Sequence, residues 1–285
     1  MIGVIGGSGL YQMEGLTNVR EERIETPFGA PSDAYILGEL DGTPMAFLPR
    51  HGRGHRFNPT EVNYRANIWG MKKLGVDWII SVSAVGSLQM DVEPGHMVII
   101  DQFIDRTKGV RKCTFFEDGI VSHVSFGDPV CKTLRRFILE ASHESGAVTH
   151  DGGIYVCMEG PQFSTRAESN LYRSWGARVI GMTNLTEAKL AREAEISYAT
   201  LAMSTDYDCW HEGHDDVTVD EVMATMGANV GVAKTIIRST VSRIVAHGGD
   251  APAKGCMRNA CMTSRELIPA ATLEKVSLLV GQYLS

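Results

Sequence analysis

Residues 198–210 read YATLAMSTDYDCW, and the change of character within this stretch points to the fold. Its first half is a nearly continuous apolar run of strand length, without the alternation of a half-exposed strand. Continuous apolar strands are typical of a sheet that is covered on both faces. The second half is polar and contains Asp206 and Asp208. The stretch therefore predicts a buried strand with two carboxylates at its end.

Similar apolar runs recur along the chain, and helical segments lie between several of them. The runs of strand length are residues 2–5, 34–37, 45–48, 78–82, 97–100, 154–158, 179–182 and 198–203. The expected helices are residues 60–74, 129–146, 165–176, 185–195 and 219–246, and two of them begin with a capping box, Thr165-x-x-Glu168 or Thr218-x-x-Glu221. Strands that alternate with helices predict an α/β fold.

A polar segment, residues 247–252 (HGGDAP), interrupts this pattern before a further expected helix at residues 264–283. We therefore expect a single domain with two parts. Residues 1–246 would form the catalytic domain, and residues 247–285 would form a C-terminal extension packed on it.

Composition excludes several classes of protein. The chain has 285 residues, of which 44% are hydrophobic, and a formal net charge of −7. The acidic balance argues against a nucleic-acid-binding surface. The mean hydropathy of −0.07, without an apolar run of about 18 residues, argues against a membrane span. Residues 1–7 (MIGVIGG) lack a basic region and a cleavage site, so we expect a first strand and no signal peptide.

The six cysteines are scattered and show no metal-ligand spacing. This pattern predicts reduced thiols in a cytoplasmic protein, although the spacing of Cys256 and Cys261 permits a disulfide. His211-x-x-His214 has a spacing that could suit a metal ion. The acidic residues around it favour a solvated loop, so no metal site is expected.

The two aspartates stand two residues apart. If the backbone stays extended, the side chains of Asp206 and Asp208 point to the same side. Like charges this close disfavour double ionisation, so one carboxyl tends to keep its proton. Such a pair can donate one hydrogen bond and accept another, as the N7/N6 edge of adenine requires. A surface turn with two solvated aspartates is the alternative interpretation.

Two segments near the N-terminus carry groups that suit an anion. Residues 6–9 (GGSG) offer backbone N–H groups and the Ser8 hydroxyl, but Gln12 stands where the GxGxxG pattern of a dinucleotide site needs its third glycine. Residues 50–56 (RHGRGHR) place five potentially cationic side chains in one glycine-containing loop after a strand.

Two further segments follow strands in the same way. Residues 81–87 (SVSAVGS) and 181–184 (GMTN) add hydroxyl groups, and a helix is expected to begin near Thr183. Each of the four segments alone could be an ordinary turn or loop. Together they predict a phosphate site.

Seven segments together resemble the methylthioadenosine phosphorylases, within the trimeric purine nucleoside phosphorylase family. They are residues 5–10 (IGGSGL), 26–33 (TPFGAPSD), 50–52 (RHG), 62–69 (VNYRANIW), 101–107 (DQFIDRT), 159–168 (EGPQFSTRAE) and 202–210 (AMSTDYDCW). The resemblance runs in order over residues 1–245. It implies a mixed, largely parallel central sheet flanked by helices, and a homotrimer with active sites at subunit interfaces. It also implies phosphorolysis of a purine nucleoside to a free base and a sugar 1-phosphate, with phosphate as co-substrate and no cofactor.

The resemblance also implies roles for single residues. Phosphate would be held by Ser8, Arg50, His51, Ser83, Ala84 and Thr183. The nucleoside would contact Phe163, Ser164, Met182, Asp206, Tyr207, Asp208, Val219 and Val222, and His123 would reach the 5′ end of the ligand in a neighbouring subunit. Three features depart from the usual pattern: serine at position 8, threonine at position 186 where proline is usual, and the loop at residues 108–127.

The aspartates bear on mechanism and specificity. We expect Asp206 to protonate N7 and Asp208 to position the N6 amine, although the sequence does not separate these roles. A 6-oxopurine would place its carbonyl against an acceptor, which costs ~1–3 kcal/mol, so a 6-aminopurine is expected. Val219 and Val222, one turn apart, would form an apolar pocket for a 5′-methylthio group.

The expected reaction is therefore phosphorolysis of S-methyl-5′-thioadenosine. The alternatives within the family are a methylthioinosine phosphorylase and a general purine nucleoside phosphorylase. The alternatives from other classes are a dinucleotide-binding oxidoreductase and a non-catalytic nucleoside sensor.

Overall fold

The computed structural model describes residues 1–7, 9–10, 12–211 and 219–284, with residues 219–221 described by their backbone alone. The strands are β1 (Ile2–Gly6), β2 (Leu16–Glu22), β3 (Tyr35–Leu40), β4 (Thr43–Pro49), β5 (Trp78–Ser87), β6 (Met97–Ile99), β7 (Gln102–Arg106), β8 (Thr149–Asp151), β9 (Ile154–Met158), β10 (Ala177–Gly181) and β11 (Ser197–Asp206). The helices are α1 (Tyr64–Lys73), α2 (Lys132–Glu144), α3 (Arg166–Ser174), α4 (Asn184–Glu193), α5 (Val219–His247) and α6 (Ala270–Val280), with 3-10 turns η1 (Asp208–Trp210), η2 (Arg265–Leu267) and η3 (Gly281–Tyr283).

The sheet is mixed, and its centre is parallel, as expected. Its strands follow the order β2-β3-β4-β1-β5-β10-β9-β7, while β11 also pairs with β5 and leads to β6 and β8. β1 pairs in parallel with β4 and β5, and β11 pairs in parallel with β5. β11 is buried at every residue before Asp206, which confirms a strand covered on both faces.

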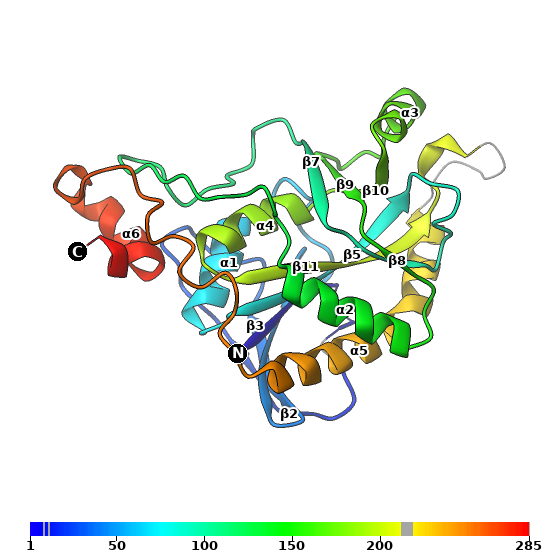
Figure 1. Cartoon of the computed structure of the whole chain (residues 1–285), viewed down its shortest axis with the longest axis horizontal. Coiled ribbons are helices and arrows are strands. Elements are labelled where there is room, and N and C mark those ends of the chain that lie inside the picture. Colours follow the sequence, from blue (N-terminus) through cyan, green and yellow to red (C-terminus); the bar gives the residue numbers. More distant parts are fainter. Residues whose placement is uncertain (8, 11, 212–218, 285) are drawn as a thin grey trace.

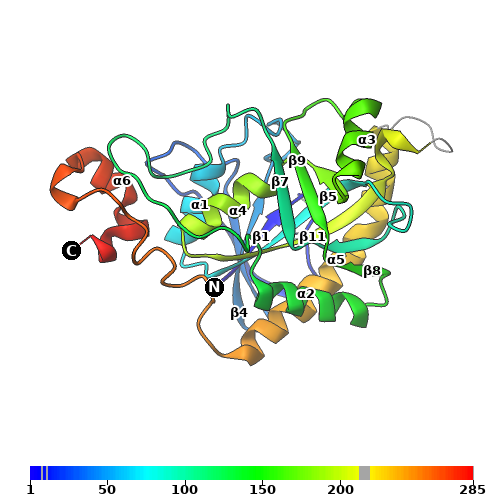
Figure 2. The same ribbon diagram turned by 45° about the horizontal axis from the view of Figure 1, so that its top comes forward.

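Helices cover both faces of this sheet (Figures 1 and 2). α1 and α4 lie together on one face, and α2 and α5 lie together on the other. Alternate residues of β1 serve two separate hydrophobic cores. Val4 packs in the core that contains residues of α2 and α5, and Ile5 packs in the core that contains residues of α1, α4 and α6. The expected helices are confirmed to within a few residues, and Thr165 and Glu168 form the predicted capping box. The second capping box begins at Thr218, outside the described residues.

Three strands were not expected from the sequence. Most residues of β2 are exposed, β7 is at most half-buried, and β8 has only three residues. Each therefore lacks an apolar run, and its place in the sheet depends on pairing with a neighbouring strand.

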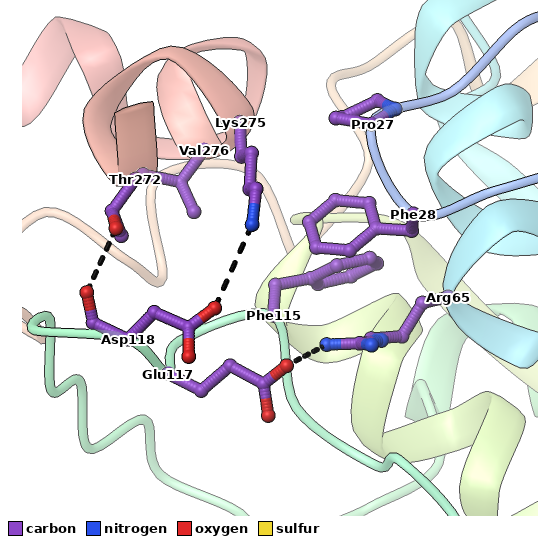
Figure 3. A pocket seen from close by; sticks show the side chains of 9 residues that line it. All are labelled: Pro27, Phe28, Arg65, Phe115, Glu117, Asp118, Thr272, Lys275 and Val276. Atoms are coloured by element: carbon purple, nitrogen blue, oxygen red, sulfur yellow. Dashed lines mark hydrogen bonds and ion pairs between the residues drawn. The ribbon is translucent and has the colours of Figure 1, made fainter. Parts of the chain in front are cut away.

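Helix α6 contacts α1 and the loop before α2. The Asp118 carbonyl accepts a hydrogen bond from the Thr272 hydroxyl at 2.7 Å, and the Asp118 carboxylate pairs with Lys275 at 3.6 Å. Figure 3 shows these contacts around a pocket beneath α6, where Arg65 also pairs with Glu117. The charged groups that line this pocket therefore pair with one another.

Candidate active site

The predicted phosphate residues follow neighbouring strands. The carboxyl ends of the parallel strands β1, β4, β5 and β11 lie at one edge of the sheet, where open α/β sheets bind ligands. The N–H of Arg50, just after β4, donates to the carbonyl of Gly6, the last residue of β1, at 3.0 Å. The glycine turn and the arginine loop are therefore adjacent. Ser8 itself lies outside the described residues.

Helix α5 lies against this glycine turn. A Cβ atom on Gly7 would lie 4.0 Å from Met226, and one on Gly9 would lie 3.7 Å from Val230. Val222 precedes Met226 by four residues, so the two share a helix face. This arrangement brings Val222 toward the turn. The backbone of residue 219 begins α5, but the side chain of Val219 lies outside the described part of the chain.

The guanidinium of Arg50 points into the protein, and the residue is only 3% exposed. Nε and Nη2 donate to the two carboxylate oxygens of Glu187 on α4. Nη2 also donates to Ser81 Oγ at 2.7 Å, and Nη1 donates to the Val82 carbonyl at 3.0 Å. Burial would lower the pKa of Arg50, but the Glu187 carboxylate outweighs burial and raises this pKa, so the group stays charged. These bonds use four of the five N–H donors and leave one for an anion.

The other arginines of this loop do not point toward the same place as Arg50. Arg53 pairs with Glu21 at 2.7 Å, and Arg56 pairs with Asp33 at 3.5 Å. Both arginines therefore pair with carboxylates outside the predicted phosphate site.

His51, in the same loop, is neutral, although a histidine can also carry a positive charge. Its Nδ1 lies 2.8 Å from the Phe57 carbonyl. Burial, reinforced by the charge of Arg50, lowers the pKa of His51 to about 4. Because a carbonyl only accepts, Nδ1 carries the proton of the neutral ring and Nε2 is left as an acceptor. His51 can thus accept a hydrogen bond from a protonated phosphate oxygen.

The hydroxyl residues gather where α4 begins. Thr183 is the N-cap of α4 and is buried, and its side chain makes no capping hydrogen bond. The side chain of the next residue, Asn184, donates to Ser81 Oγ at 3.0 Å. This bond ties the start of α4 to β5, which also contains Ser83 and Ala84. Unpaired N–H groups at a helix start favour an anion.

The two aspartates lie at the end of β11, but the backbone does not stay extended through both, so the condition for side chains that point to the same side is not met. Tyr207 turns the chain at φ −94° and ψ 20°, and Asp208 adopts a left-handed φ of 51°. The turn places the Asp208 N–H 2.8 Å from Asp206 Oδ1. Asp206 Oδ2 also accepts a hydrogen bond from the Thr205 hydroxyl at 2.7 Å. The carboxylates are therefore joined through the backbone of the turn.

Asp208 is the more buried member of the pair. Its carboxylate oxygens lie 3.1 and 3.3 Å from the Ser164 hydroxyl that donates to them. Burial raises the pKa of Asp208, although its hydrogen bonds partly oppose this shift. A Cβ on Gly86 would lie 2.9 Å from Asp206 Oδ1, so the absence of a side chain there lets the pair pack on β5.

Met182 is held between two segments. A Cβ on Gly160, whose φ is 67°, would lie 2.4 Å from Met182 Sδ. Arg111, from the loop between β7 and α2, donates through Nη1 to the Met182 carbonyl and through Nε to Glu159 Oε1 at 2.8 Å. Arg111 therefore joins Met182 to the segment that carries Phe163 and Ser164.

The remaining predicted residues lie at the margin of this group. Phe163 is 44% exposed. The Tyr207 ring stacks on His211 at 4.7 Å, and its hydroxyl lies 3.5 Å from the Met90 carbonyl. The N–H of His123 donates to Ala260 in the C-terminal extension at 2.8 Å.

The sequence model of the phosphorylase superfamily matches residues 1–242. This chain belongs to the phosphorylase superfamily. A relative from Geobacter sulfurreducens named S-methyl-5′-thioadenosine phosphorylase is 61% identical over 99% of both chains. A relative of the same name from Chloroflexus aurantiacus is 56% identical over 100% of this chain and 98% of that protein.

Solved phosphorylase structures share this fold. A methylthioadenosine phosphorylase from an antarctic soil metagenomic library has a TM-score of 0.93 and 49% identity, with 98% of each chain covered. A methylthioadenosine phosphorylase from Schistosoma mansoni in complex with adenine has a TM-score of 0.86 and 34% identity, over 92% of this chain and 98% of that one. The fold class implied by the resemblance is confirmed.

Sequence reasoning missed two groups in this phosphorylase. The interior group contains Glu187, Asn184 and Tyr198, and the other contains Arg111 and Glu159. A glutamate in the first turn of an expected helix was the only signal for Glu187. No local pattern marks Arg111, because its partners lie far away in sequence.

The residues that the structure describes contain no group of three or more histidines, cysteines or carboxylates that could hold a metal ion, and His214 of the H-x-x-H pattern lies outside them. No described helix is both long and apolar enough to cross a membrane. All six cysteines are described, and none forms a disulfide, so Cys256 and Cys261 are not bonded to each other.

Proposed function

We propose that this phosphorylase cleaves S-methyl-5′-thioadenosine with inorganic phosphate, to give adenine and 5-methylthioribose 1-phosphate. The observation that carries the proposal is the Asp206–Asp208 pair, which lies at the same sheet edge as Arg50 and the start of α4. Full-length relatives with this name support it.

In this reaction the C1′–N9 bond breaks and a bond forms between C1′ and a phosphate oxygen. Positive charge develops on the ribose and negative charge on the purine. A phosphate anion beneath the ribose stabilises the first, and a proton at N7 neutralises the second. No cofactor is needed, since phosphate is itself a substrate. We assign phosphate to Ser8, Arg50, His51, Ser83, Ala84 and Thr183.

The nucleoside lies, in this proposal, between the aspartate pair and α5. Asp206 contacts N7 of the purine and Asp208 contacts the N6 amine, while the Ser164 hydroxyl donates a hydrogen bond to Asp208. Phe163, Met182, Tyr207, Val219 and Val222 are assigned to the base, the ribose and the 5′-methylthio group. The raised pKa of Asp208 supports a pair that enters the reaction with one proton.

We further propose a homotrimer in which His123 of one subunit approaches the nucleoside of the next. Residues 1–246 would be the catalytic domain and residues 247–285 an extension packed on it. An isolated antiparallel β-bridge pairs the backbones of Ser122 and Cys261. This pairing supports an extension that holds the loop with His123 in place. The scattered cysteines, which show no metal-ligand spacing, support a cytoplasmic enzyme.

The test is release of adenine from S-methyl-5′-thioadenosine with and without inorganic phosphate. We expect release only with phosphate, and one 5-methylthioribose 1-phosphate for each adenine. Release without phosphate would indicate hydrolysis, and nucleoside binding without release would indicate a sensor. Either result would contradict the proposal.

A further inference from the structure

The Arg50–Glu187 ion pair lies beneath the predicted phosphate site and is almost fully buried. The side chains of Arg50 and Glu187 are 4% and 2% exposed. The contact is bidentate, because Nε and Nη2 each meet one carboxylate oxygen. Such a fork holds the guanidinium plane in one orientation.

Neutral groups surround the carboxylate. The Ser81 hydroxyl and the Tyr198 hydroxyl both donate to Glu187 Oε2, at 2.8 and 2.9 Å. The Asn184 amide then links Ser81, Tyr198 and Thr200 through hydrogen bonds of 3.0 Å. Within this cluster the positive charge of Arg50 is therefore balanced by a single carboxylate.

This balance bears on how tightly the site can hold phosphate. An incoming phosphate anion is attracted by Arg50 but repelled by Glu187, and both act in an interior that screens charge poorly. Only one N–H of Arg50 remains for the anion, and His51 is neutral. A site with a weak net positive charge binds its anion loosely, and this suits an enzyme whose second product also carries a phosphate that must leave.

We propose that Glu187 sets the phosphate affinity by cancelling the charge of Arg50 while it holds the guanidinium in place. Glu187 is thus a positioning residue whose negative charge also weakens phosphate binding. The proposal rests on the proposed function, since it assumes that phosphate binds beside Arg50.

The Glu187→Gln variant separates charge from geometry. Its amide oxygen can still accept from Arg50 Nε, and its amide nitrogen can donate to the Tyr198 hydroxyl, although the contact with Arg50 Nη2 is lost. With the carboxylate gone, inorganic phosphate should bind about tenfold more tightly to the full chain in titration calorimetry. The KM for phosphate should fall without a rise in kcat, because added ground-state binding does not lower the barrier from the bound state.

The Glu193→Gln variant, compared at about pH 8, is the matched control, because burial raises the pKa of Glu193 to about 7 and the carboxylate is charged above that pH. Glu193 is a buried carboxylate on the same helix, but it accepts hydrogen bonds from Thr114 and from the Phe115 N–H. Its phosphate affinity should stay within about twofold of the wild type, as expected for an independent site. An equal gain in both variants would overturn the proposal.

The remaining outcomes are also decisive. If the wild type binds no phosphate, the proposed function fails. If the wild type binds phosphate and a folded Glu187→Gln variant binds it no more tightly, only the role of Glu187 fails. If that variant does not fold, the Glu187→Asp variant tests the proposal, because aspartate keeps the negative charge on a shorter side chain. Its phosphate affinity should stay within about threefold of the wild type, and a loss greater than about tenfold would show a purely geometric role.

Discussion

The backbone N–H of Asp208 donates a 2.8 Å hydrogen bond to the carboxylate of Asp206. This contact arises because β11 ends in a turn and Asp208 adopts a left-handed backbone conformation. The first carboxylate therefore lies at the strand end, and the second lies buried against Ser164. Two similar side chains thus acquire different environments, as a pair with divided roles requires.

Removal of the proposed acid should slow the reaction strongly. One general acid contributes ~10²–10⁴-fold, so Asp206→Ala should lower kcat for S-methyl-5′-thioadenosine at least about a hundredfold. Circular dichroism and the phosphate affinity should remain close to the wild type. A loss of less than about tenfold would remove Asp206 from this role.

Replacement of Asp208 by asparagine should shift the preference between purines. An asparagine amide can donate to a 6-oxo group, which the aspartate pair does not favour. The ratio of kcat/KM for methylthioinosine to that for methylthioadenosine should rise about tenfold or more, equivalent to roughly 1.4 kcal/mol. An unchanged ratio would show that Asp208 does not face the six position.

Glu193 should make stability fall as the pH rises. Burial raises the pKa of Glu193 from 4.5 to about 7. The native state therefore holds a proton that the unfolded state releases, so this contribution is complete below about pH 4.5 and is lost as the pH rises through about 7. The loss in the free energy of unfolding should be about 3 kcal/mol.

Urea unfolding between about pH 5 and pH 8 measures this effect. Glu193→Gln resembles the protonated form, since it can donate to Thr114 and accept from the Phe115 N–H. It should have a flatter pH dependence than the wild type. Identical slopes in the two proteins would exclude Glu193 as the source.

Loss of Arg111 should affect nucleoside binding more than phosphate binding. Arg111→Met would leave Glu159 without its buried partner, which should lower the free energy of unfolding by about 3 kcal/mol. Because Arg111 also holds the Met182 carbonyl, KM for the nucleoside should rise about tenfold while KM for phosphate changes little. The exposed pair of Lys132 and Asp128 supplies the control, and Lys132→Met should change stability by less than about 1 kcal/mol. Equal effects on both KM values would contradict this assignment.

Local sequence patterns predicted the elements that bury apolar runs. β1, β5 and β11 are mostly buried, and their continuous apolar sequences mark them. β2 could not be predicted in this way, because its polar residues are held only by pairing with β3. The turn at Tyr207 was missed for a related reason, since two aspartates at alternate positions are also compatible with an extended strand.

The sequence predicted the site residues that follow strand ends, but not the buried contacts behind them. Resemblance and hydroxyl patterns indicated Arg50, Thr183 and the aspartates. The bidentate Glu187 contact joins residues 137 positions apart, and that of Arg111 with Glu159 joins residues 48 positions apart. Such contacts depend on how α4 and the loop before α2 pack in three dimensions, which no local pattern encodes.

The most direct test of the central claim compares four nucleosides with saturating phosphate: methylthioadenosine, adenosine, methylthioinosine and inosine. If the aspartate pair selects a 6-aminopurine beside an apolar 5′ pocket, kcat/KM should be highest for methylthioadenosine, and each 6-oxo analogue should fall at least about tenfold below its 6-amino counterpart. Faster cleavage of inosine than of methylthioadenosine would contradict the account.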